Sequence, residues 1–133
     1  VKDRVGAELE QTSYAWKSML ELGVHVAGGS DSPVESFDVM KNIYCAVTRK
    51  GLDGMPQEGW LPQQKLSVEE AVYIFTMGGA YASYDERING SVTVGKQADF
   101  AVIDRNIFTV NPEEIKDAQV VMTVLDGEIV YRK

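Results

Sequence analysis

The chain has 133 residues with a formal net charge of −7, and it contains one His and one Cys. The length suits one domain with a real core, and 44% hydrophobic with 25% charged residues is an ordinary globular composition. The acidic balance argues against nucleic-acid binding, which needs clustered Lys and Arg. A single Cys excludes an internal disulfide and favours a reducing, cytoplasmic compartment. A single His excludes a His-rich metal centre built from this chain alone.

Neither membrane-spanning nor signal-peptide patterns are visible. No stretch reaches the roughly 18 to 20 continuous apolar residues of a membrane helix, and no basic region precedes an apolar run at the N-terminus. The sequence starts at Val1, inside what reads as a helix. We therefore expect a piece of a longer protein.

The first half of the chain has the pattern of an α/β protein. Residues 1–22 predict one amphipathic helix, and Gly23 suits its end. Residues 24–29 then form a short apolar run with β-branched residues, which predicts a strand over 24–31 that is buried on both faces, as in a parallel sheet. A second helix is predicted from apolar residues at helical spacing: Phe37, Met40, Tyr44 and Val47. Helix, strand and helix with short connections indicate the α/β class.

The second half changes from helical to β character. Residues 50–65 predict a long loop, and Ser67 with Glu70 forms a capping box that starts a helix. We expect Gly78 and Gly79 to interrupt that helix. Asp126-Gly127 between two apolar runs is the signature of a type I′ hairpin. The remaining predictions are strands over 91–94, 98–104 and 119–126, with a turn or one-turn helix at 111–114.

Asp31 is the sharpest candidate for chemistry. It closes the predicted strand, and the C-terminal ends of parallel strands are where α/β active sites form. A carboxylate at that place can bind a metal or take a proton from water. The competing interpretation is that Asp31 merely caps the next turn, which is at least as frequent for Asp before Ser-Pro.

Other chemically capable residues favour structural roles. His25 lies six strand residues from Asp31, about 20 Å away, so one metal ion cannot bind both, and we expect a buried or interface histidine. Cys45 lies on a predicted helix with no His near it in sequence, which favours a buried structural thiol over a nucleophile. Trp16 is expected in the core. Trp60 could be a packing anchor or part of a substrate lid, and we favour the anchor.

An ordered set of segments resembles one known family. Residues 23–34, GVHVAGGSDSPV, resemble the last barrel strand of metal-dependent amidohydrolases, in the amidohydrolase-3 branch that includes N-substituted formamide deformylase-like proteins. The resemblance continues through further segments in the same order: 43–49, 59–62, 66–71, 81–83, 90–104 and 124–131. It therefore covers nearly the whole chain.

The resemblance implies a fold, a reaction and a division of the chain. It implies the C-terminal fragment of a (β/α)8 TIM-type barrel, joined to part of a small composite β-sandwich. Residues 1–65 would hold the last barrel helix-strand-helix and an active-site loop, residues 66–88 connecting helices, and residues 89–133 the β unit. Asp31 would be both metal ligand and catalytic proton shuttle in hydrolysis of non-peptide C–N bonds, whereas Gly95 and Asp99 would be structural.

The departures from the family pattern set further expectations. No His-x-His pair is present, so the divalent metal, expected to be zinc, would be held mainly by residues outside the chain. We expect no tight metal binding and no activity for these 133 residues alone, a small amide-type substrate for the parent enzyme, and no nucleic-acid or membrane partner. Unpaired strands and apolar faces predict a homo-oligomer or a rearranged N-terminal half, with residues 66–133 closer to the family. The alternatives are a non-enzymatic oligomerising β-domain, scaffold or binding module and, more weakly, a thiol enzyme at Cys45.

Overall fold

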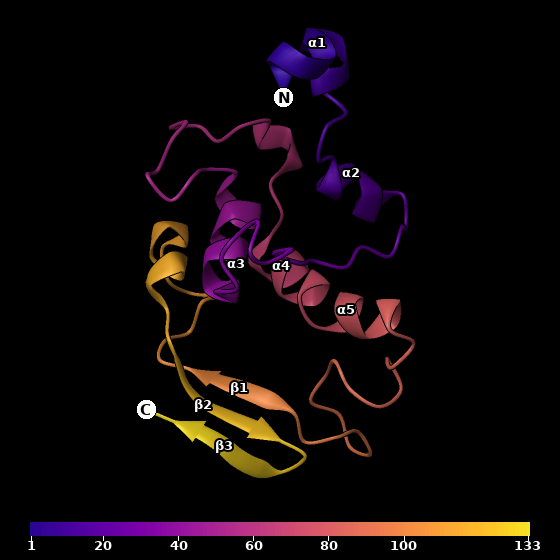
Figure 1. The fold of residues 1–133 in the computed structure, drawn as a ribbon, viewed down its shortest axis with the longest axis vertical. Coiled ribbons are helices and arrows are strands. Elements are labelled where there is room, and N and C mark those ends of the chain that lie inside the picture. Colours follow the sequence, from indigo (N-terminus) through magenta and orange to yellow (C-terminus); the bar gives the residue numbers. More distant parts are fainter.

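The computed structural model describes all 133 residues and divides into a helical part and a small sheet (Figure 1). Helices fill the half that contains the N-terminus, and a three-stranded sheet lies at the other end beside the C-terminus. The elements in chain order are α1 Lys2–Glu10, α2 Trp16–Glu21, α3 Val39–Thr48, η1 Pro62–Gln64, α4 Val68–Ile74, α5 Met77–Ala82, β1 Phe100–Ile103, η2 Pro112–Asp117, β2 Val120–Leu125 and β3 Glu128–Arg132. No helix has the length and apolar character needed to cross a membrane.

The N-terminal segment forms two short helices instead of the single predicted helix over residues 1–22. Gly6 adopts φ +83° and kinks α1, and the backbone at Tyr14 adopts φ +50° in the turn before α2. Neither α1 nor α2 contains a buried residue. With no apolar face packed along its whole length, the segment lacks the tertiary support that keeps a long amphipathic helix continuous.

Two predicted strands are absent. Residues 24–30 run as extended, irregular chain without strand pairing, and Asp31 already belongs to a turn. A strand is stabilised by hydrogen bonds to a neighbouring strand, and the three strands of this chain pair only with one another. Residues 91–94 are likewise irregular, and Val92 and Val94 are fully exposed.

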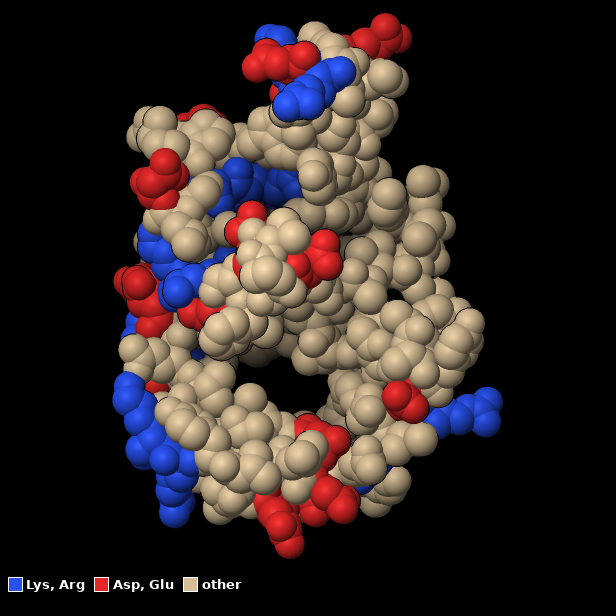
Figure 2. All heavy atoms as spheres, in the orientation of Figure 1, with Lys and Arg blue, Asp and Glu red and all other residues tan.

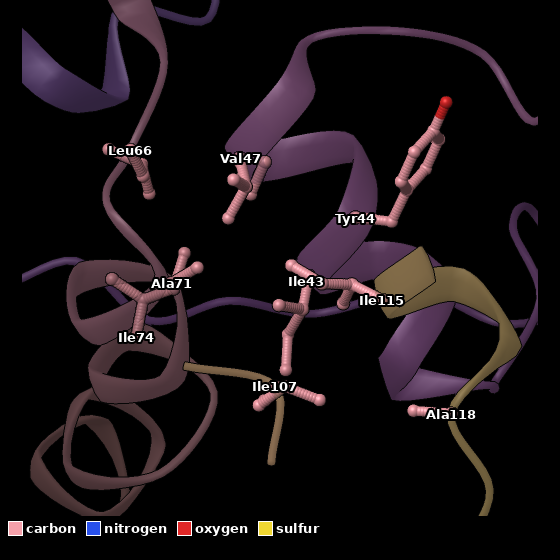
Figure 3. Packing of buried hydrophobic residues seen from close by; sticks show 10 residues of the cluster. Ile43, Tyr44, Val47, Leu66, Ala71, Ile74, Ile107, Ile115 and Ala118 are labelled. Atoms are coloured by element: carbon pink, nitrogen blue, oxygen red, sulfur yellow. The ribbon is translucent and has the colours of Figure 1, made fainter. Parts of the chain in front are cut away.

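The hydrophobic core forms around α3 (Figure 3). Asp38 caps the helix through its side chain, which accepts a hydrogen bond from the Met40 backbone N–H at 3.2 Å. The predicted second helix is thus confirmed, although Phe37 precedes it and is exposed. The core members come from α3, from α4 and its approach, and from the stretch around η2: Ile43, Tyr44, Ala46, Val47, Leu66, Ala71, Ile74, Ile107, Ile115 and Ala118.

The helices that follow the long loop begin where predicted but break elsewhere. Ser67 and Glu70 form both hydrogen bonds of the capping box, which confirms the start of α4. The break falls at Phe75 and Thr76, whereas Gly78 and Gly79 lie inside α5. A Cβ on Gly78 would lie 2.2 Å from the Val26 carbonyl oxygen. The glycine therefore permits close approach of the 24–30 segment and does not end the helix.

The sheet is an antiparallel meander in the order β1-β2-β3. Asp126 and Gly127 adopt φ +50° and +81° between β2 and β3, which agrees with the predicted type I′ turn. The Asp99 carboxylate accepts a hydrogen bond from the Asp126 backbone N–H at 2.6 Å, a structural contact. The α/β class is confirmed for this small chain, whereas the barrel and sandwich portions stay predictions.

Candidate functional site

A cleft of about 640 Å³ runs between α3, the irregular 26–31 segment and the N-terminal aromatic residues. Its lining includes Asp31, Cys45, Arg49, Trp16 and Trp60. Over the face of the molecule shown in Figure 2, acidic and basic side chains are interspersed with large uncharged areas. The cleft is the place in the chain where several chemically capable side chains line one cavity.

Asp31 is available for chemistry at one part of this cleft. The residue is exposed, and its carboxylate forms no hydrogen bond or ion pair within the chain. Its backbone adopts φ +51°, a left-handed conformation that Asp tolerates better than most residues. Its carbonyl accepts from the Val34 N–H at 2.9 Å, and the Ser30 carbonyl accepts from the Glu35 N–H at 3.1 Å. The backbone thus fixes the turn and leaves the carboxylate free.

The segment that leads to Asp31 is held against α4 and α5 by close backbone contacts. The Gly28 N–H donates to the Ile74 carbonyl at 2.8 Å. A Cβ on Gly28 would lie 2.9 Å from the Phe75 ring at the end of α4. Gly78 in α5 lets the Val26 carbonyl approach closely, because glycine has no Cβ. These contacts replace the strand pairing that the sequence predicted, and they determine where Asp31 lies.

Cys45 lines the same cleft without the environment of a nucleophile. The thiol is half-buried, and burial raises its pKa, with the negative charge of Glu35 raising it further. A reactive thiolate needs the opposite shift. The predicted structural role therefore fits the structure better than the thiol-enzyme alternative does.

Arg49 is the site residue that the sequence analysis missed. It is only 6% exposed, and its guanidinium carbon lies 4.7 Å and 4.8 Å from the ring centroids of Trp16 and Trp60. Its Nε donates to the Trp60 carbonyl at 3.0 Å, and its Nη1 donates to the Tyr14 carbonyl at 3.2 Å. Burial lowers the pKa of the guanidinium. No local sequence pattern predicts the cluster of Arg49 with Tyr14, Trp16 and Trp60, because its members are separated by up to 46 residues.

The two tryptophans behave as packing residues. Trp60 lies over the Arg49 guanidinium, and its indole N–H donates to the Glu10 carboxylate at 3.1 Å, contacts that suit the predicted anchor, while the residue also lines the cleft. Trp16 is half-buried at the margin of the core and not inside it. Both rings also contact the Arg49 guanidinium.

The sequence predicts a buried or interface histidine at position 25, and the buried alternative is wrong. Its ring is exposed and stacks on Tyr81, with ring centroids 3.9 Å apart and planes 21° apart. Residues 24–30 form no strand, so the separation of about 20 Å expected for His25 and Asp31 along a regular strand does not apply. His25 contributes nothing to the cleft.

The donors of this chain do not fit a complete metal site. A catalytic zinc takes about three protein ligands, and no group of three or more His, Cys, Asp and Glu side chains lies together in a way that could hold an ion. The cleft offers two carboxylates without hydrogen-bond or ion-pair partners, those of Asp31 and Glu35, which are too few for a complete site. No reaction step can be derived through a metal bound to these residues alone.

Comparisons with known proteins give consistent matches. Residues 1–131 match the model of a family described as "Amidohydrolase family". YtcJ of Bacillus subtilis (strain 168) is 35% identical over 133 residues, which are 100% of this chain and 25% of YtcJ. The N-substituted formamide deformylase of Arthrobacter pascens is 32% identical over 117 residues, covering 88% of this chain and 21% of that protein. The chain therefore spans a quarter or less of the length of these relatives.

Solved structures show the same relationship at the level of the fold. An amidohydrolase from Thermotoga maritima MSB8 superposes with a TM-score of 0.65 at 20% identity, covering 93% of this chain and 26% of that one. Guanine deaminase of E. coli superposes with a TM-score of 0.66 at 23% identity, covering 88% of this chain and 30% of that one. Each neighbour thus matches this chain with about a quarter to a third of its own length.

Proposed function

The chain belongs to the amidohydrolase family, and we propose that it is the Asp31-bearing part of a metal-dependent hydrolase of non-peptide C–N bonds. The observation that supports this most directly is the free, exposed carboxylate of Asp31 on a fixed turn in the cleft. Support for the reaction class comes from the names of relatives, which include a formamide deformylase and a guanine deaminase. The substrate we propose is a small molecule with an amide or formamide group.

The chemistry proposed for Asp31 is proton transfer. The carboxylate takes a proton from the attacking water, whose oxygen forms a bond to the carbonyl carbon. When the C–N bond breaks, Asp31 returns that proton to the leaving nitrogen, so the carboxylate is regenerated. General acid–base transfer of this kind contributes about 10²- to 10⁴-fold in rate.

The proposal includes a metal ion whose ligands come mainly from residues outside this chain. A divalent ion, which we expect to be zinc, would polarise the carbonyl and the water. Asp31 would supply one ligand, and the other ligands would come from outside these 133 residues. We therefore propose that the chain alone binds no metal tightly and has no hydrolase activity.

The architecture inferred from the family resemblance is proposed on the same basis. Residues 1–65 would contribute to the end of a (β/α)8 barrel, residues 66–88 would connect, and residues 89–133 would form part of a composite β-sandwich. A cytoplasmic location and a homo-oligomeric state complete the proposal.

A second candidate, a non-enzymatic binding or scaffold module, is favoured by one observation. Strand β3 is exposed at every position and forms a free edge that carries Ile129, Val130 and Tyr131. Free edges of this kind add strands from other chains. Strand addition without any effect of Asp31 substitution would favour this candidate over the hydrolase.

The test transplants the chain into a relative of named activity. The matching segment of the Arthrobacter deformylase is replaced by these residues, and formate release from an N-substituted formamide is measured with zinc. We expect activity in the chimera and a loss of about 10²-fold or more with Asp31→Asn.

Glu35→Gln is the matched control, because Glu35 is another acidic residue of the cleft, four positions from Asp31. It should retain most of the activity. Equal losses from the two substitutions would contradict a special role for Asp31, and so would turnover by the isolated chain loaded with zinc. A chimera that folds but releases no formate with Asp31 intact would contradict the reaction class.

A further inference from the structure

Arg49 is a buried cation without an anionic partner. It takes part in none of the ion pairs of the chain. Its Nη2 is buried and has no hydrogen-bond partner, while Nε and Nη1 donate to main-chain carbonyls. Charged side chains that leave water are normally paired with an opposite charge and fully hydrogen-bonded. The guanidinium therefore has an unmet requirement for an acceptor with negative charge.

The surroundings of Arg49 form an aromatic cage, defined here as Tyr14, Trp16 and Trp60. The guanidinium carbon lies within 5 Å of the centroids of both indole rings, at 4.7 Å and 4.8 Å, and Tyr14 contacts both rings edge-on at centroid distances of 5.9 Å and 5.8 Å. Aromatic rings this close to a guanidinium limit the directions from which a ligand can approach it, and its remaining N–H groups can hold a carboxylate with two parallel hydrogen bonds. The cage thus restricts what can bind and from which direction.

The cage opens on the cleft that also holds Asp31. Arg49, Trp16 and Trp60 line that cleft, whose volume of about 640 Å³ is in the range of small-ligand sites and whose lining residues are apolar and polar in nearly equal numbers. We propose that Arg49 is the anchor of a second binding position in the cleft, which takes the carboxylate of a small apolar or aromatic acid. This position is distinct from Asp31 and does not depend on the hydrolase activity proposed above.

Binding of a carboxylate requires the turn that carries Tyr14 to move, because the Tyr14 carbonyl occupies Nη1 of Arg49. A carboxylate across the Nη1–Nη2 edge replaces the Tyr14 carbonyl at Nη1 and gives Nη2 its first acceptor. Tyr14 adopts φ +50°, a conformation that is unfavourable for a tyrosine, and its side chain is exposed. The exchange replaces one hydrogen bond from the guanidinium to a neutral carbonyl by two hydrogen bonds to a negatively charged carboxylate.

The experiment uses phenylacetate as the probe and phenylacetamide as its neutral counterpart of nearly equal shape. The chain has two tryptophans, and both belong to the cage, so their indole N–H signals in NMR report on this place alone. We expect saturable shifts with phenylacetate at a Kd of about 1 mM, as suits a ligand of its size. Phenylacetamide should bind about tenfold more weakly or not at all.

Two variants decide whether Arg49 is responsible. Arg49→Lys keeps the charge but loses the planar fork, so phenylacetate should bind about tenfold more weakly. Arg87→Met is the matched control, because Arg87 is an exposed arginine that does not line the cleft. It should leave the affinity unchanged. Circular dichroism checks that each variant is folded.

Three results would overturn the proposal. They are equal binding of phenylacetate and phenylacetamide, unchanged binding in Arg49→Lys, and no saturable shift up to roughly 10 mM phenylacetate. If Arg49→Lys does not fold, the comparison of acid and amide on the unmodified chain still decides the outcome.

Discussion

Ile115 joins the helical half to the chain around the sheet, and its truncation should have the largest effect of any single substitution proposed here. The side chain is completely buried and lies in η2, packed against the core helix α3. Polar contacts hold η2 in place, because Glu113 accepts from the Tyr44 hydroxyl at 3.1 Å and from Lys50 at 2.7 Å. The backbone cannot collapse into the space that Ile115→Ala leaves, so a cavity remains.

The magnitude follows from that geometry. Ile→Ala substitutions at buried positions lower the free energy of unfolding by about 2–5 kcal/mol, and the loss is larger where the surrounding structure cannot relax into the cavity. We expect about 3–4 kcal/mol. At about 0.05 kcal/mol per residue, the low end of the usual range, the whole chain has about 7 kcal/mol of stability. This end of the range suits a chain with 18 buried residues out of 133. The substitution should therefore remove about half of the total.

Urea unfolding followed by circular dichroism measures this loss. With a slope of about 1.5–2 kcal/mol per M, the midpoint should fall by about 2 M. Ile129→Ala is the matched control, because Ile129 lies on β3 and is 55% exposed. It should lower the free energy of unfolding by less than about 1 kcal/mol. A loss below 1 kcal/mol for Ile115→Ala, or equal losses for the two variants, would refute the assignment of the core.

Three further predictions concern single positions. Gly59→Ala should lower the free energy of unfolding, measured with urea, by about 2 kcal/mol more than Gly54→Ala does. Both glycines have φ near +83°, but only at Gly59 would the new Cβ clash with a carbonyl oxygen, that of Thr48. The Arg105 guanidinium and a backbone N–H lower the pKa of Asp104 from 3.8 to about 2. Its stabilisation is therefore complete above about pH 4 and is lost as the pH falls towards 2, and Asp104→Asn should flatten the measured stability in that window. Cys45, whose pKa is raised by burial, should react with iodoacetamide at pH 7.5 more slowly than a cysteine in an unfolded peptide, and equal rates would contradict its burial.

Elements whose signals are local were predictable from the sequence. The Ser67–Glu70 capping box, the Asp126-Gly127 turn and the apolar face of α3 depend on residues within one or two turns of each other, and each is present. The same holds for β1, β2 and the one-turn helix at η2. In each case a short stretch satisfies its own hydrogen bonds or those of an adjacent strand.

Elements that depend on distant partners were not predictable in this way. The 24–31 segment has the composition of a buried strand, yet no strand of this chain pairs with it, and it packs through Gly28 and Gly78 on helices instead. The Arg49 cage is equally non-local. For the candidate site, the sequence singled out Asp31 but could not place it beside the Arg49 cage, which required the fold of the residues between them.

The core cluster has a consequence for how the chain can be divided. Ile107, Ile115 and Ala118 follow β1 in sequence, yet they complete the core around α3. The connection between β1 and β2 thus crosses from the sheet to the helices and back. A truncation after residue 99 would remove three of the ten core residues together with the sheet. We therefore expect the helical half to be inseparable from the C-terminal third, and amide hydrogen exchange should show both halves opening in one cooperative step.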